Sequence, residues 1–115
     1  MQQKVRRYMP SPEAPSVPSV DDDLDPLVHS PARLKILTVL KEVEGAEFLF
    51  LLRQTDLTRG NLSSHLSKLE AAGYVRITKE FVEKIPRTLI QLTEAGKTAL
   101  EIYRQRMLQQ LERLK

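Results

Sequence analysis

The chain has 115 residues and a hydrophobic fraction of 41%, which is enough for one domain with a modest core. Cysteine is absent, and this excludes a disulfide framework, a thiolate metal site and a cysteine nucleophile. The formal net charge of +3 divides unevenly: residues 1–30 hold three Lys/Arg against five Asp/Glu, a net of −2, so residues 31–115 carry +5. The basic sign of the longer part favours an acidic partner.

Residues 1–23 are rich in proline and serine, and such a composition cannot bury enough apolar surface to fold alone. We therefore expect a flexible arm. Its cations, Lys4, Arg6 and Arg7, are candidates for a distant nucleic-acid contact, but a solvated tail is the more frequent outcome. Neither a signal peptide nor a run long enough to span a bilayer is visible, so we expect a cytoplasmic protein that makes no membrane contact.

The first ordered elements are predicted from residue 24 onward. Asp25-Pro26 suggests a short turn through residue 29, and Ser30-Pro31 marks a helix start. Apolar residues then recur at helical spacing, which predicts a helix over residues 31–44 that ends before a glycine. A very short strand at residues 47–48 and a second helix over residues 49–55 follow.

The segment 56–75 carries the clearest signals in the chain. Thr58 is a helix cap and Gly73 suits the left-handed residue past a helix end, so we expect a helix over residues 59–72. Its apolar stripe consists of Leu62, Leu66 and Leu69. Since only three residues join it to the preceding helix, the pair predicts a helix-turn-helix.

The other side of this helix carries Asn61, Ser64, Ser67 and Lys68 instead of the Glu/Lys pairs of a solvated face. Short hydrogen-bonding side chains let a helix backbone approach a DNA groove closely, which favours a recognition helix. The alternative is that these residues are merely tolerated on a surface.

Downstream the period changes to two, which predicts a β-hairpin with strands near residues 74–78 and 87–92 and a long charged loop over residues 79–86. Lys79, Lys84 and Arg87 give this hairpin the makeup of a wing lying along a phosphate backbone. Pro86 is expected to limit the return strand to a sheet edge.

Thr93 is predicted to cap a final helix over residues 94–115. Its apolar stripe is wider than a domain of this size needs, so we expect it to form a dimer. The residues assigned to this surface are Leu100, Tyr103, Met107, Leu108, Leu111 and Leu114. The alternative is a helix that folds back on its own domain.

Three segments together resemble known proteins: DPLVHSPARLKIL, GNLSSHLSKLEAAGYV and PRTLIQLTEAGKTAL. They look like the small stand-alone transcriptional regulators related to the MarR and ArsR families, over about residues 24–110. The resemblance implies a mainly α fold with a small β-hairpin, namely a winged helix-turn-helix over residues 24–92 followed by a C-terminal dimerisation helix. It also implies a homodimer that binds specific double-stranded DNA sequences.

Carried over by position, the resemblance assigns base- and phosphate-facing roles to Arg59, Asn61, Ser63, Ser64 and Lys68. It matches His65 to a histidine that often precedes the central leucine, and Lys84 and Arg87 to the wing. We expect His65 to be a phosphate contact on DNA or a hydrogen-bonded structural residue. The chain departs from the family pattern at two positions. Leu49 stands where a Ser or Thr cap is frequent, which puts a regular start of the second helix in doubt, and Gly60 replaces a frequent polar side chain.

Other functions find less support in the residues. His29 and His65 are isolated, so we expect no metal and no cofactor, and the sequence offers no set of residues for catalysis. An effector of unknown identity would bind near the dimer interface or compete at the DNA surface. The main alternative is a winged-helix module that binds another protein and has no specific DNA affinity.

Overall fold

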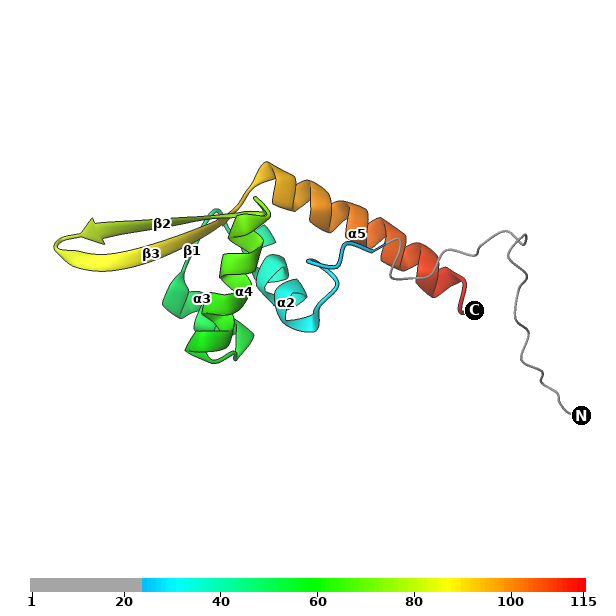
Figure 1. Cartoon of the computed structure of the whole chain (residues 1–115), viewed down its shortest axis with the longest axis horizontal. Coiled ribbons are helices and arrows are strands. Elements are labelled where there is room, and N and C mark those ends of the chain that lie inside the picture. The colour runs from blue at the N-terminus through cyan, green and yellow to red at the C-terminus, as the bar shows by residue number, and fades with distance from the viewer. Residues whose placement is uncertain (1–23) are drawn as a thin grey trace, which may run out of the picture.

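The computed structural model describes residues 24–115, so the flexible arm predicted for residues 1–23 lies outside the described residues. The elements, in chain order, are α2 (Pro31–Lys41), β1 (Ala46–Glu47), α3 (Phe48–Thr55), α4 (Arg59–Ala71), β2 (Val75–Val82), β3 (Ile85–Leu92) and α5 (Glu94–Glu112). The β2–β3 hairpin projects to one side of the three shorter helices, and α5 runs away on the other side (Figure 1). The predicted fold class is confirmed, with β1 added to the hairpin as a third strand.

The core lies where α2, α3 and α4 meet the base of the sheet. Its fully buried side chains are Val28, Ile36, Leu37, Leu40, Leu51, Thr55, Leu62, Leu69 and Ile90. Burial of one such aliphatic side chain contributes about 1.5–3 kcal/mol, so the leucine stripe of α4 is a large part of what holds that helix in place.

The helix boundaries lie within one residue of the predictions except at two ends. α5 ends at Glu112, three residues before the predicted end at residue 115. α2 ends at Lys41 instead of residue 44, because residues 42–44 form the turn that brings β1 beside β3. α3 begins at Phe48, one residue early, and no side chain caps its start. Asp56 ends α3 in a left-handed conformation with φ 59°.

The hairpin is longer and tighter than the sequence suggested. The predicted loop over residues 79–86 is wrong, because the two strands continue to Val82 and from Ile85, with only Glu83 and Lys84 between them. Both turn residues have positive φ, 53° and 69°, as the tight turns that match strand twist require. Beyond the core both faces of the ladder meet solvent, so its charged residues do not break the strands.

The prediction from Pro86 that the return strand lies at a sheet edge is wrong, because the sheet order is β1-β3-β2 and β3 is the central strand. β1 pairs only with Leu89 and Ile90, however, so it does not reach Pro86, which lies opposite Phe81 of β2. Proline is tolerated there because β3 has only one neighbouring strand along that part of its length.

A junction at Gly73, Tyr74 and Thr93 joins α4, the hairpin and α5. Gly73 has φ 80°, and its carbonyl accepts a 2.6 Å hydrogen bond from the Thr93 hydroxyl. The Thr93 amide donates to the Tyr74 carbonyl at 3.0 Å, and the Thr93 hydroxyl caps α5 by accepting from Gly96 at 3.0 Å. A Cβ atom at Gly96 would lie 2.2 Å from the Tyr74 carbonyl oxygen, so α5 begins in direct contact with the backbone that follows α4.

This contact predicts that Gly96→Ala destabilises the fold, because backbone at both positions must move to admit a methyl group. We expect a loss of about 1–3 kcal/mol or more in urea unfolding. Gly60→Ala is the matched control, since no atom lies within 4 Å of its Cβ position. In a helix this control substitution should be neutral or stabilising by up to about 1 kcal/mol. Equal stabilities of the two variants would contradict the close contact.

Candidate nucleic-acid interface

The start of α4 is organised by Thr58, whose hydroxyl accepts a 3.1 Å hydrogen bond from the Asn61 amide. Leu62, Leu66 and Leu69 are buried, which orients the rest of the helix toward solvent. Five predicted DNA-binding residues are exposed on it: Arg59, Asn61, Ser63, Ser64 and Lys68. The structure therefore brings them together on one accessible helix.

His65 differs from these neighbours because it is half-buried. Its Nδ1 lies 3.1 Å from a guanidinium nitrogen of Arg33 on α2. Arginine only donates, so Nδ1 accepts in this contact and the imidazole is neutral. Burial, followed by the positive charges of Arg33 and Lys68, lowers the pKa of His65 below its usual 6.5. The contact with Arg33 thus fixes the imidazole ring on the side of α4 that faces α2. The predicted contact of His65 with DNA stays a prediction.

Arg33 is a residue that the sequence analysis missed. Besides His65, its guanidinium donates to the carbonyl oxygens of Leu27 at 2.6 Å and Pro26 at 3.4 Å. One side chain therefore ties the turn before α2 to the middle of α4. A single arginine in the first turn of an amphipathic helix is usually solvated, so no local pattern signals this role.

The same turn also holds the end of α4 through Tyr74. The Tyr74 hydroxyl donates a 2.5 Å hydrogen bond to Asp25, whose other carboxylate oxygen accepts from the Leu27 amide at 2.9 Å. That bond, with burial and the charge of Asp25, raises the pKa of Tyr74 to about 12. The exposed helix is thereby braced against residues 25–33 at two points.

On the hairpin, the three cations that were predicted to contact DNA differ in exposure and in ion pairing. Lys79 and Lys84 are exposed. Arg87 is half-buried on β3, and its guanidinium forms a 2.8 Å ion pair with Glu47 of β1. Its charge is thus already balanced within the sheet, while those of Lys79 and Lys84 face solvent.

The apolar stripe of α5 divides into two parts. Tyr103 is only 6% exposed, and its hydroxyl lies 2.9 Å from Nδ1 of His29, so it packs within its own domain. Leu100 and Met107 are half-buried against the core. Leu108, Leu111 and Leu114 are exposed beyond it. The part of α5 around Tyr103 therefore packs on its own domain, and dimerisation through the exposed leucines stays a prediction.

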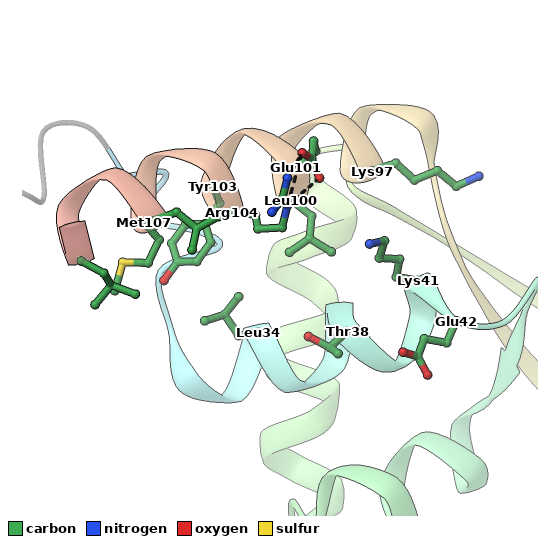
Figure 2. Close-up of a pocket in the computed structure, with 12 residues that line it drawn as sticks. Leu34, Thr38, Lys41, Glu42, Lys97, Leu100, Glu101, Tyr103, Arg104 and Met107 are labelled. Carbon is green, nitrogen blue, oxygen red and sulfur yellow. Dashed lines mark hydrogen bonds and ion pairs between the residues drawn. The ribbon is translucent and has the colours of Figure 1, made fainter.

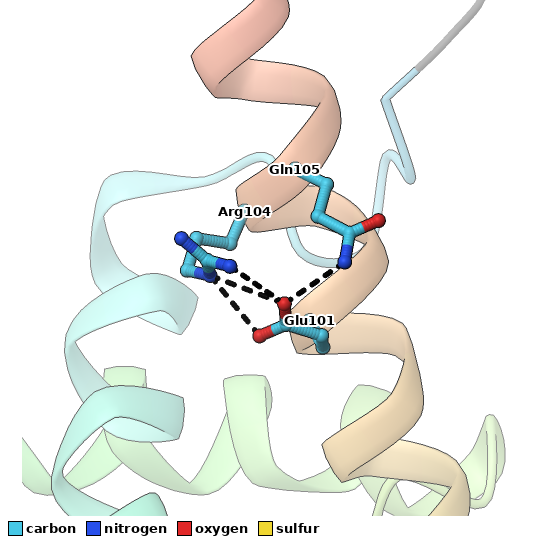
Figure 3. Close-up of polar contacts among 3 residues, drawn as sticks. All are labelled: Glu101, Arg104 and Gln105. Carbon is cyan, nitrogen blue, oxygen red and sulfur yellow. Dashed lines mark hydrogen bonds and ion pairs between the residues drawn. The ribbon is translucent and has the colours of Figure 1, made fainter.

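A groove of about 540 Å³ lies between α2 and α5. Leu34, Leu100 and Met107 lie between the two helices, and Lys41 stands at the rim (Figure 2). Another rim cation, Arg104, donates at 2.8 Å to Glu101, which also accepts from Gln105 at 3.1 Å (Figure 3). The bonds from Arg104 and then Gln105 lower the pKa of Glu101 to about 2, so the pair stays ionised.

The family follows from comparison with known proteins. The family described as a winged helix DNA-binding domain matches residues 32–111 of the chain. The chain belongs to this family. It is 37% identical over 83 residues to the uncharacterized protein MJ0432 of Methanocaldococcus jannaschii, and the alignment covers 72% of this chain and 90% of that protein.

Solved structures agree with this winged helix assignment. A transcriptional regulator homologue from Pyrococcus horikoshii OT3 superposes with a TM-score of 0.73 at 29% identity, over 77% of this chain and 88% of that one. A MarR-family regulator from Silicibacter pomeroyi superposes with a TM-score of 0.59 at 25% identity, over 76% of this chain but only 58% of that one. The predicted resemblance to MarR-like regulators is confirmed.

Two further observations concern the described residues, 24–115. Within them, no group of three or more histidine, aspartate or glutamate side chains is placed to hold a metal ion. No helix in this range is long and apolar enough to cross a membrane.

The environment of His65 predicts a pH dependence of stability. Because the folded protein lowers its pKa, the unfolded chain takes up the proton first as the pH falls below 6.5. The stability contributed by neutral His65 is therefore complete well above pH 6.5 and is lost as the pH falls toward its folded pKa. Between pH 7.5 and 5.5, wild-type protein should lose more of its free energy of unfolding than His65→Gln does. Parallel losses in the two proteins would refute this assignment.

Proposed function

We propose that this winged helix chain is a homodimeric transcriptional regulator that binds specific sequences in double-stranded DNA. The observation that carries the proposal is the exposed side of α4, where short hydrogen-bonding side chains and cations share one accessible helix. Such side chains let the helix backbone approach the base edges of a major groove. Membership of a DNA-binding family and similarity to a transcriptional regulator homologue support it.

We assign different roles to the residues of α4. Asn61, Ser63 and Ser64 are short enough to read base edges, and an asparagine can bond an adenine through both of its side-chain groups. Arg59 and Lys68 position the helix by contacting phosphates, and His65 adds a phosphate contact beside them. The amides at the N-terminus of the helix favour a phosphate as well.

On the wing, Lys79 and Lys84 contact the phosphate backbone, since both are exposed. Arg87 is the weakest of the predicted DNA contacts, because a phosphate would have to compete with Glu47 for its guanidinium. We assign Arg87 mainly to holding β3 against β1, and only secondarily to DNA.

Dimerisation uses the C-terminal part of α5 and the residues just after its end at Glu112. Leu108, Leu111 and Leu114 are 48%, 50% and 81% exposed, and a second copy would remove this apolar surface from water. A two-fold dimer presents the same surface from both copies, so a projecting helix of each can pair with that of the other. Leu100 and Met107 extend the dimer surface at the edge of the groove. Tyr103 is buried within its own domain, where it packs α5 against the core.

The regulator acts in the cytoplasm, carries out no reaction and uses neither a metal nor a cofactor. An effector, where one exists, binds the groove between α2 and α5 beside the dimer surface or competes at the DNA surface. The alternative function, a protein-binding module, predicts weak DNA binding with no sequence preference. Competition between genomic fragments from around the protein's own gene and random DNA separates the two functions.

Substitutions on α4 and the wing should separate base reading from phosphate binding. Asn61→Ala should weaken selective binding by about 1–3 kcal/mol for one good base contact, while binding to random DNA changes little. Lys84→Ala should weaken binding to selected and to random DNA alike. It should also reduce the magnitude of the slope of log affinity against log salt concentration, which we expect to be about −5 to −9 for a dimer. Lys115→Ala, which removes a cation paired with Glu112, is the control. Equal losses on selected and random DNA for Asn61→Ala would remove its assigned role.

The dimer surface is tested by a charge placed on it. Leu111→Glu should give a monomer at micromolar concentration in sedimentation experiments, because a carboxylate would be buried between two copies. Gln109→Glu adds the same charge to a neighbouring exposed position of α5 and should leave the mass unchanged. A dimer that survives Leu111→Glu would move the interface elsewhere.

A further inference from the structure

The tip of the wing is apolar as well as charged. Phe81 is 75% exposed and Ile85 62% exposed, and the adjacent residues Val82 and Pro86 are exposed too. The strand register pairs Phe81 with Pro86 and Val82 with Ile85. The last two rungs of the hairpin are therefore apolar, although no part of the core lies near enough to bury them.

The two faces of the wing differ in charge. Side chains alternate between faces along a strand, so Phe81 and Pro86 share one face with Lys79 and its partner Thr88, and with the buried residue Ile90 near the core. That face carries no acidic residue from β2 or β3. The opposite face holds Glu80 directly across from Arg87, which is also paired with Glu47.

The charge of the face that carries Phe81, Pro86 and Lys79 indicates which kind of molecule it binds. Lys79 lies two residues before Phe81 on the same strand, a separation of about 7 Å, and Lys84 follows in the turn. Glu83 stands beside Lys84 in the turn, so the turn adds no net charge, and Lys79 is the charged residue on the strand face that carries Phe81. An exposed aromatic side chain beside a lysine, on a strand face without acids, fits base edges that are flanked by phosphates.

The dimensions of the wing support the same occupant. Strands of eight residues span about 26 Å, whereas a major groove is about 12 Å wide. With α4 in the major groove, a hairpin that leaves the C-terminal end of α4 extends past one phosphate backbone to the neighbouring minor groove. The two-residue turn keeps its tip narrow.

We propose that Phe81, backed by Pro86, inserts as an apolar wedge into the minor groove beside the site read by α4, with Lys79 and Lys84 on the flanking phosphates. Apolar side chains inserted at a base step partly unstack and kink the duplex. Pyrimidine–purine steps kink most easily, so the wedge selects such a step at a fixed distance from the major-groove contacts. This inference rests on the proposed DNA-binding function and adds a specificity determinant to it.

The test is a selection of binding sites from a pool of random-sequence duplexes by the full-length protein. The wild type should enrich a central motif and, at a fixed distance from it, TA or CA steps. Phe81→Ser should keep the central motif, lose the flanking steps and bind the wild-type consensus about 10-fold more weakly. Phe81→Leu, which retains an apolar wedge, should restore the flanking preference, and Val82→Ser, on the opposite face, should resemble the wild type.

The outcomes separate this inference from the function on which it rests. A flanking preference that is unchanged in Phe81→Ser overturns the wedge while the regulator function stands. A wild type that enriches no sequence overturns both. A change in the solution mass of Phe81→Ser, with unchanged site selection, overturns the wedge by assigning the tip to contacts between protein chains. Circular dichroism of each variant confirms that it is folded, as expected for substitutions at exposed positions.

Discussion

The junction of Gly73, Tyr74 and Thr93 determines how the three outward-reaching elements of this protein are oriented. α4, the wing and α5 leave it in different directions. Two hydrogen bonds donated by Thr93, together with the Gly96 contact, hold the junction together. A contact between backbones has no side-chain rotamers through which to relax. A displacement of α5 at this point must therefore move the end of α4 or the base of the wing.

The turn before α2 adds a second connection among the same elements. It reaches α4 through Arg33 and His65, the start of β2 through Asp25 and Tyr74, and α5 through His29 and Tyr103. These contacts are polar and directional, so they fix orientation more than they add stability. In a dimer formed by the end of α5, the spacing of the two recognition helices would then be set by how the two α5 helices pair, with little freedom inside each subunit.

Features that depend on residues close together in the sequence were predicted, whereas features that depend on contacts between distant residues were missed. The caps Thr58 and Thr93 and the left-handed Gly73 act within a few residues, and the two ends of α4 and the start of α5 followed from them to within one residue. The hairpin was predicted, but its strands were predicted to be too short, because Glu83-Lys84 lacks the Asn or Gly that usually marks such a turn. The pairing of Arg87 with Glu47 and the burial of Tyr103 depend on contacts across 40 and 74 residues of sequence, which no local pattern encodes.

The internal pairing of cations bears on how a protein of this size would discriminate among DNA sequences. Arg87 and Arg104 are balanced by Glu47 and Glu101, so fewer cations are available to displace counterions from DNA than the positive charge of the chain suggests. Because counterion release is nearly independent of sequence, a smaller release lowers affinity for all DNA alike. In the proposed complex, a larger share of the binding free energy would then come from groove contacts of α4 and from deformation of DNA by the wing. Since the loss is common to all sequences, the ratio of specific to non-specific binding would be set by these sequence-dependent contacts and not by the internal ion pairs.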